Sequence, residues 1–157
     1  MSKSLDKNRM TPKRSVLMLV YNGGLYLKTA IESILNQTYH NFQLLIINDG
    51  STDKSLSIIH GFQDPRIRIV HNDGNKGLVY SRNSGTSEAK GEFIAVMDCD
   101  DISLSTRLEK QLNFLEKNTE FAAVGSLVQS INQDGRHIGK PWDLLATPAH
   151  LHAIIFF

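Results

Sequence analysis

Residues 93–101, which read FIAVMDCDD, begin as a short apolar run and end in the carboxylates of Asp98, Asp100 and Asp101. So short and so apolar a run predicts a strand that is buried on both faces, as in a parallel sheet covered by helices. Burying the carboxylates would cost more than the strand gains, so we expect them to emerge at its carboxyl end. In open α/β sheets, ligands bind at that edge.

Two interpretations of this acidic cluster are open at this point. Clustered carboxylates repel one another unless a cation lies between them, and their oxygen atoms suit a hard divalent ion such as Mg²⁺ or Mn²⁺. Such an ion commonly binds a phosphate as well, because one or two carboxylates complete only part of its octahedron. The alternative is a solvated acidic turn that caps the next helix, since a D-x-D pattern is common by chance.

The composition bounds the class of protein. The length of 157 residues suggests about one domain, and an apolar share of 41% is enough for a core. The 17 basic and 16 acidic side chains nearly balance, which gives no reason to expect a nucleic-acid partner. Cys99 is the only cysteine, so an internal disulfide is excluded and a reducing compartment fits. No apolar run is long enough to span a bilayer, and we expect residues 1–14 to be a polar tail before a domain over residues 15–157.

Strand patterns and helix patterns alternate along the chain. Besides the run at residue 93, strands are predicted over residues 15–21, 42–47, 65–71 and 121–131. Helices are predicted over residues 25–35, 53–61, 78–89 and 108–118, and a hairpin turn at residues 133–136. This alternation predicts an α/β fold with a mainly parallel sheet and right-handed crossovers. The acidic loops after the strands at residues 42 and 93 should then lie on one sheet edge and converge on one ligand.

Two loops at predicted helix starts carry residues that could bind a nucleotide. In residues 48–53 (NDGSTD), Ser51 or Thr52 can cap the helix, so Asp49 is left over as an acceptor for the ring N–H of a pyrimidine base. The helix start in residues 75–83 (NKGLVYSRN) lies near Lys76 and Arg82, which suits phosphate oxygens. Taken singly, each loop also fits ordinary turn and cap chemistry or a solvated helix face.

In combination, the motifs VYNGG, NDGSTD, NKGLVYSRN and DCDD, in this order, resemble the family 2 glycosyltransferases of the GT-A fold. The segment YLKTAIESILNQTYHNFQLLIINDGSTD is especially characteristic, and the resemblance runs from about residue 15 to residue 126. It implies a Rossmann-like three-layer α/β/α fold with a mainly parallel sheet. It also implies a nucleotide-diphospho-sugar donor, usually with Mg²⁺ or Mn²⁺, and transfer of a hexose or related sugar with inversion at the anomeric carbon. Uridine is the commonest base in such enzymes.

The resemblance also implies roles for individual residues. Tyr21 would border the base near the backbone of Val20, Asp49 would hydrogen-bond the base, and Arg82 would lie close to the donor sugar. Asp98 would meet the ribose or the metal, and Asp100 would be the main metal ligand of the D-x-D motif. The implied donor-binding residues are Val20, Tyr21, Asn22, Asp49, Lys76, Arg82, Asp98 and Cys99, and the implied metal ligands are Asp98 and Asp100.

Three positions depart from the family pattern. Leu19 stands where a proline is usual, and Asn48 replaces the first aspartate of the usual DDGS, although the base-binding position remains Asp49. Cys99 occupies the middle of the D-x-D motif, where small residues are common, so we expect it to pack rather than react.

The family carries its acceptor site and its general base in a later half. No acidic residue after Asp101 has the matching context, so this chain should contain no catalytic residue, and we expect the base beyond Phe157. The chain would then be the donor-binding half of a transferase and inactive alone. We expect a glycan or lipid-linked acceptor, a role in cell-envelope polysaccharide synthesis, and a location in the cytoplasm or at the inner face of the cell membrane.

Three alternatives to a transferase differ in how well they fit these motifs. A non-catalytic nucleotide-binding module, either a fragment or a pseudoenzyme, fits the same donor motifs. A phosphoacceptor receiver domain needs an acidic pair after the first strand, where this chain has residues 22–24 (NGG). A classical dinucleotide fold needs G-x-G-x-x-G after the first strand, and this chain has no such motif there.

Overall fold

The computed structural model describes residues 14–140, which divide between two units, Met1–Lys110 and Gln111–Phe157. The elements are β1 (Arg14–Val20), α1 (Leu27–Leu35), β2 (Phe42–Asn48), α2 (Ser55–His60), β3 (Ile67–His71), α3 (Leu78–Glu88), β4 (Phe93–Asp98) and α4 (Arg107–Lys117). Arg14, predicted as the last residue of the tail, is the first residue of β1 and is buried. The rest of the predicted tail lies outside the described residues.

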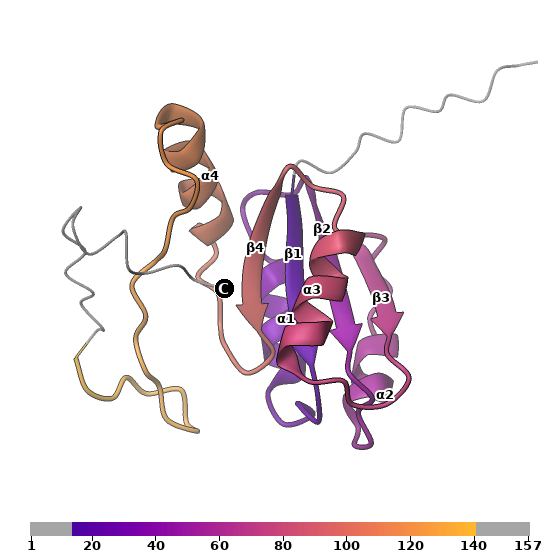
Figure 1. Ribbon diagram of the computed structural model, residues 1–157. Coiled ribbons are helices and arrows are strands. Elements are labelled where there is room, and N and C mark those ends of the chain that lie inside the picture. Colours follow the sequence, from indigo (N-terminus) through magenta and orange to yellow (C-terminus); the bar gives the residue numbers. More distant parts are fainter. Residues whose placement is uncertain (1–13, 141–157) are drawn as a thin grey trace, which may run out of the picture. The chain divides into compact units, whose positions relative to one another are not determined.

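The first unit contains a parallel sheet with the strand order β3-β2-β1-β4 (Figure 1). β1 pairs with β2 on one side and with β4 on the other, so that Val20 lies opposite Asn48 and Leu19 lies opposite Asp98. β2 and β4 therefore end at the same edge. The prediction that Asp49 and Asp98 share the carboxyl edge of one parallel sheet is confirmed.

Helices cover both faces of this sheet, which gives the predicted three layers (Figure 1). One apolar cluster joins the sheet to α1 and α2, and its fully buried members include Val16, Met18, Leu44, Ile31 and Ile59. The opposite face buries Leu17, Leu45 and Ile47, and α3 contacts β1 and β2 there. Because side chains alternate along a strand, the continuous apolar runs of β1 and β2 supply both clusters.

α3 approaches the sheet closely because Gly85 has no side chain. A Cβ atom on Gly85 would lie 2.4 Å from Cδ1 of Leu17 and 3.0 Å from Cγ1 of Ile47. A glycine inside a helix costs about 1 kcal/mol relative to alanine. Here the cost is offset by packing of the helix backbone against the core.

β4 corrects one expectation from the sequence. Ile94 is 38% exposed and Val96 is 41% exposed, so the strand is not buried on both faces. β4 is one of the two edge strands of this sheet, whereas α3 lies over β1 and β2. The register puts Ile94 beside Ser15 and Val96 beside Leu17, on the face that α3 covers further along the sheet. Within residues 14–140 that face of β4 remains open to solvent.

The second unit contains the later part of α4 and an irregular segment. The rings of Phe114 and Phe121 lie 5.6 Å apart between centroids. The prediction of a strand over residues 121–131 is wrong, because this segment forms only isolated bridges. The turn predicted at residues 133–136 is confirmed, since Ile131 forms an antiparallel bridge with His137 across it.

A partly buried ion pair lies just before β3. Nε of Arg66 donates to Oδ1 of Asp64 at 3.0 Å, and Nη2 donates to Oδ2 at 2.8 Å and to the Leu35 carbonyl at 3.0 Å. The guanidinium also lies 4.7 Å from the centre of the Phe42 ring. The side-chain hydrogen bond from Arg66 lowers the pKa of Asp64 below its ordinary value, outweighing the effect of burial.

This ion pair predicts a pH dependence of stability. A carboxyl group whose pKa is lowered by folding stabilises the fold above its unfolded pKa, and that contribution is lost as the pH falls through the folded pKa. The free energy of unfolding should therefore fall below about pH 4. For the Asp64→Asn variant, the free energy of unfolding should fall less steeply below this pH. Between pH 6 and 8 its pH dependence should be parallel to that of the wild type. Urea unfolding across this range measures both slopes, and equal slopes below pH 4 would contradict the assignment.

Candidate functional site

Four loops lie at the carboxyl edge of the sheet, one after each strand. In chain order the first loop is residues 21–26, the second 49–54, the third 72–77 and the fourth 99–106. The first two loops are joined through Asn22, whose backbone has a left-handed φ of +51°, a conformation that asparagine tolerates better than most residues. Asn22 Oδ1 accepts a hydrogen bond from the Thr52 amide at 2.8 Å, and the Asn22 amide donates to Ser51 Oγ at 3.1 Å. Asn22, predicted to bind donor, thus also fastens the first loop to the second.

These contacts explain why α2 does not use the predicted cap. Ser51 and Thr52 were expected to cap this helix, but their polar groups contact the first loop, and the N-cap residue is Lys54 without a side-chain bond. Asp53 Oδ1 instead accepts from the Ser55 amide, and Asp53 Oδ2 accepts from the Gly24 amide, both at 2.9 Å. Asp53 thereby serves the start of α2 and the first loop together.

Asp49 follows β2 and is only 5% exposed. Its Oδ1 accepts from Asn72 Nδ2 at 2.7 Å and from the Lys76 amide at 2.9 Å, and its Oδ2 accepts from the Gly77 amide at 2.9 Å. Burial raises the pKa of Asp49, but the hydrogen bonds from Asn72, Lys76, Ser81 and Gly77 together hold it below its ordinary value. The site therefore contains a charged carboxylate that anchors the third loop.

The second and third loops also touch through glycines. Gly50 has a φ of +73°, and a Cβ atom there would lie 2.5 Å from the carbonyl carbon of Gly74. Asn72 extends the contact, because its Nδ2 also donates to Ser81 Oγ at 2.7 Å. Sequence reasoning missed Asn72 and Gly74. Their only signal is a polar turn after β3, which any surface loop could show.

The acidic cluster after β4 is exposed to solvent at Asp98, Asp100 and Asp101. Partial desolvation and the charges of Asp98 and Asp100 raise the pKa of Asp101, and the charge of Arg107 opposes this shift. Nη2 of Arg107 donates to the Val96 carbonyl at 2.8 Å, which holds this cation beside the cluster. Sequence reasoning missed Arg107, because its contact with this cluster depends on how α4 meets β4 after folding.

Cys99 packs against the first loop. A Cβ atom on Gly23 would lie 2.8 Å from Cys99 Sγ, and the Cys99 side chain also contacts the core on the α1 face. Burial and the nearby Asp100 raise the pKa of the thiol. The protonated thiol therefore acts as a small apolar side chain in the middle of the acidic motif.

The other predicted donor residues lie at or near the same edge. Val20 is fully buried at the end of β1, and Tyr21 is 49% exposed immediately after it. Lys76 is exposed to solvent, and its backbone amide donates to Asp49. Arg82 is half-buried in α3. The geometry brings together the loops that carry these residues.

The side chains that could bind a divalent ion at this edge are the carboxylates of the acidic cluster. Among residues 14–140, no three histidine, cysteine, aspartate or glutamate side chains gather closely enough to hold an ion by themselves. One or two carboxylates are, however, the usual protein share of a Mg²⁺ site that also includes phosphate. The exposed carboxylates of Asp98 and Asp100, whose charges already raise the pKa of Asp101, fit such a shared site.

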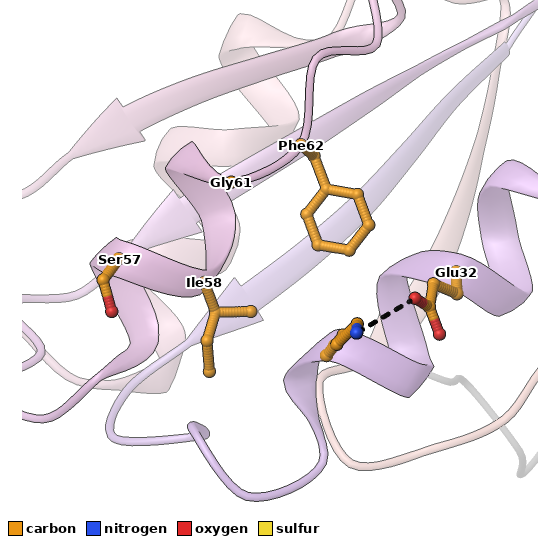
Figure 2. Close-up of a pocket in the computed structure, with 6 residues that line it drawn as sticks. Glu32, Ser57, Ile58, Gly61 and Phe62 are labelled. Atoms are coloured by element: carbon orange, nitrogen blue, oxygen red, sulfur yellow. Dashed lines mark ion pairs between the residues drawn. The ribbon is translucent and has the colours of Figure 1, made fainter.

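A pocket of about 400 Å³ lies elsewhere, between α1 and α2 (Figure 2). It is lined by Lys28, Glu32, Ser57, Ile58, Gly61 and Phe62. Lys28 Nζ and Glu32 Oε1 form an ion pair across 3.8 Å at its border. None of the predicted donor-binding residues lines this pocket, so it is separate from the candidate site.

No described helix combines the length and the apolar character needed to cross a bilayer. This observation concerns residues 14–140 alone.

Solved structures of similar fold include glycosyltransferases with bound nucleotides. The S. aureus protein TarS, residues 1–349 in complex with UDP-GlcNAc, matches with a TM-score of 0.65 and 25% identity, over 68% of this chain and 32% of that one. The mannosyltransferase PcManGT from Pyrobaculum calidifontis, in complex with GDP-Man and Mn²⁺, matches with a TM-score of 0.61 and 20% identity, over 66% and 32%. The fold is therefore the Rossmann-like GT-A fold.

Curated proteins match at higher identity. An uncharacterised glycosyltransferase from Haemophilus influenzae is 43% identical over 109 residues, which are 68% of this chain and 44% of that protein. The glycosyltransferase GlyG of Streptococcus pneumoniae is 36% identical over 123 residues, or 77% of this chain and 41% of that protein. The chain thus spans less than half the length of these relatives. The profile of glycosyl transferase family 2 matches residues 15–152, and with most of its length covered the chain belongs to that family.

Proposed function

We propose that the carboxyl edge of this sheet binds a nucleotide-diphospho-sugar, with uridine as the base, together with Mg²⁺ or Mn²⁺. The chain would be the donor-binding half of an enzyme that transfers the sugar with inversion. The observation that carries the proposal is that a buried, charged Asp49 and the exposed acidic cluster at the end of β4 lie on the same edge of the sheet. The nucleotides bound in the similar structures of TarS and PcManGT support the same class of ligand.

Asp49 is the proposed recognition group for the base. A carboxylate has about four acceptor positions, of which N–H groups of the chain occupy three. The hydroxyl of Ser81 also donates a hydrogen bond to this carboxylate. This hydroxyl can rotate away, which would leave the fourth acceptor position to a ring N–H of the base. Val20 and Tyr21 end the neighbouring strand, and the exposed Tyr21 ring would border the base.

The diphosphate would lie between the start of α3 and the acidic cluster. Lys76 and Arg82 supply cationic groups on the third loop and α3, and phosphate oxygens suit both. Asp98 and Asp100 would hold the cation, with Asp100 as the main ligand and Cys99 as the packed spacer between them. When bound, the ion would neutralise charge on the diphosphate and so stabilise the leaving nucleotide.

The reaction itself is a proposal for the whole protein. An inverting transfer needs a general base on the face opposite the leaving diphosphate, and such a base contributes about 10²–10⁴-fold in rate. We place that base, and the site for a glycan or lipid-linked acceptor, in sequence beyond Phe157. A nucleotide-binding module without catalysis is the second candidate, because the chain covers only 41–44% of the relatives quoted. An assay of nucleotide release with and without acceptor, on this chain and on a longer natural chain, separates the two.

Removing one metal ligand tests the binding half directly. Calorimetric titration of the wild-type chain with UDP should show tighter binding with Mn²⁺ than with chelator. Asp100→Ala should lose about 10–100-fold of the affinity seen with Mn²⁺, because even partners outside the ligand sphere contribute that much, and should bind UDP normally in chelator. Asp134→Ala, an exposed carboxylate in the hairpin turn of the second unit, is the matched control. Metal-independent binding by the wild type, or full metal dependence in Asp100→Ala, would contradict the proposal.

A further inference from the structure

Gln37, just beyond the end of α1, is fully buried and uses its whole amide group. Its Nε2 donates to the carbonyls of Leu104 at 2.8 Å and Ser33 at 3.1 Å, and to Ser103 Oγ at 3.2 Å. Its Oε1 accepts from the Leu108 amide at 3.0 Å. That amide is in the first turn of α4, where helix N–H groups lack partners within the helix. Gln37 thus caps a helix that begins seventy positions later in the chain.

Neighbouring residues at the end of α1 hold the same segment. The Ser103 amide donates to Ser33 Oγ at 3.0 Å, and the Thr38 amide donates to the Ser105 carbonyl at 2.8 Å. Thr38 Oγ1 also donates to Glu109 Oε2 at 2.7 Å. We call residues 103–108 the anchored segment, because the end of α1 fixes it along its length.

The acidic loop, residues 99–102, lies between two fixed points. On one side Asp98 is held by the pairing of β4 with β1, opposite Leu19. On the other side the anchored segment begins at Ser103, which is buried. Within the turn, the Asp101 amide approaches the Asp98 carbonyl only at 3.4 Å. Cys99 packs against Gly23 and the core on the other side of Asp100. The placement of Asp100 therefore depends on Cys99 and on the anchored segment more than on hydrogen bonds inside the turn.

We propose that Gln37 is a positioning residue for Asp100, the metal-binding carboxylate of the acidic loop. It contacts neither the metal nor the nucleotide, and acts by fixing the carboxyl side of the loop through residues 103, 104 and 108. The inference rests on the proposed function, because it concerns the geometry of the metal site at Asp98 and Asp100. Residues that orient metal ligands from outside typically contribute about 10–100-fold to metal affinity.

The Gln37→Glu variant keeps the size and the Oε1 acceptor for Leu108, but turns an acceptor toward the Leu104 and Ser33 carbonyls. We expect about tenfold weaker Mn²⁺ binding in the presence of UDP, measured by electron paramagnetic resonance. UDP affinity in chelator should be unchanged, because Asp49 and its partners are elsewhere. Leu45→Val shortens a core side chain on the opposite face of the sheet, in a cluster that includes no residue of the anchored segment, so it should lower stability and change neither affinity.

Thr38→Val is the second variant and keeps the test decisive if Gln37→Glu does not fold. It removes the hydroxyl bonds to Glu109 and Ser105 but leaves the Thr38 amide bond intact, and should weaken Mn²⁺ binding in the same direction. If the wild type binds UDP with Mn²⁺ dependence and the folded Gln37 and Thr38 variants retain it fully, this inference is overturned and the proposed function stands. If the wild type shows no Mn²⁺ dependence, the proposed function fails, and the inference fails with it.

Discussion

Gly50→Ala is expected to lower the free energy of unfolding by about 2–5 kcal/mol. Part of this cost, about 1–2 kcal/mol, is the strain of a Cβ atom at a left-handed φ of +73°. A further cost of about 1–3 kcal/mol comes from overpacking, because the new atom would lie 2.5 Å from the Gly74 carbonyl carbon. The obstacle is backbone rather than a flexible side chain, so the two loops would have to separate. Urea unfolding of the variant measures the loss.

Gly74→Ala is the matched control for this prediction. Its φ is +78°, close to that of Gly50, but a Cβ atom there would meet nothing within 4 Å. It should therefore show the strain alone, about 1–2 kcal/mol. Gly50→Ala should also weaken UDP binding, since separating the loops moves Asp49 from the amides of the third loop. Equal destabilisation by the two variants would mean that the contact between the loops is looser than described.

Asp49→Ala is expected to weaken UDP binding by about 10–100-fold, because hydrogen bonds to charged groups contribute about 1.5–3 kcal/mol. The loss should be the same with Mn²⁺ and with chelator, in contrast to Asp100→Ala. Stability should fall as well, by about 2–4 kcal/mol, since the amides of Lys76 and Gly77 lose their acceptor.

Two measurements separate these effects of Asp49→Ala. Binding is titrated at a temperature where circular dichroism shows the variant to be folded, so that the loss reflects recognition. Asp49→Asn keeps the volume and one acceptor oxygen, and should fall between the wild type and Asp49→Ala in stability. A folded Asp49→Ala variant that binds UDP as tightly as the wild type in chelator would remove Asp49 from base recognition.

The positions of the strands could be predicted because their apolar runs are continuous and their flanking loops are polar. β1, β2 and β3 appear within two residues of the predicted starts, and the shared edge of Asp49 and Asp98 follows from parallel pairing. The exposed face of β4 could not be predicted, because an apolar run does not say whether a strand is central or at the edge. The segment over residues 121–131 shows the converse, since its apolar run pairs only in isolated bridges within residues 14–140.

The candidate site could be predicted in its residues but not in their bonds. Asp49 was recognised because it was not needed as a helix cap, whereas its contacts with Asn72 and Lys76 join loops from different strands. Gln37 lies just beyond a predicted helix, where the sequence pattern indicates only a turn, but its side chain contacts a segment that follows β4. Such contacts leave no periodic pattern in the sequence, because they depend on how distant loops meet after folding.

The central place of β1 has a consequence for how the chain folds during synthesis. Among the described strands β1 is made before the others, and its partner β2 follows soon after, but β4 on its other side comes only after the whole of β3 and α3. At about 5–20 residues per second, β1 waits for several seconds with one row of backbone N–H and C=O groups unpaired. Closing so long a loop also slows folding, because its entropy is lost before the pairing rewards it. Until β4 is made, the open edge of β1 is therefore exposed to mispairing and to chaperones.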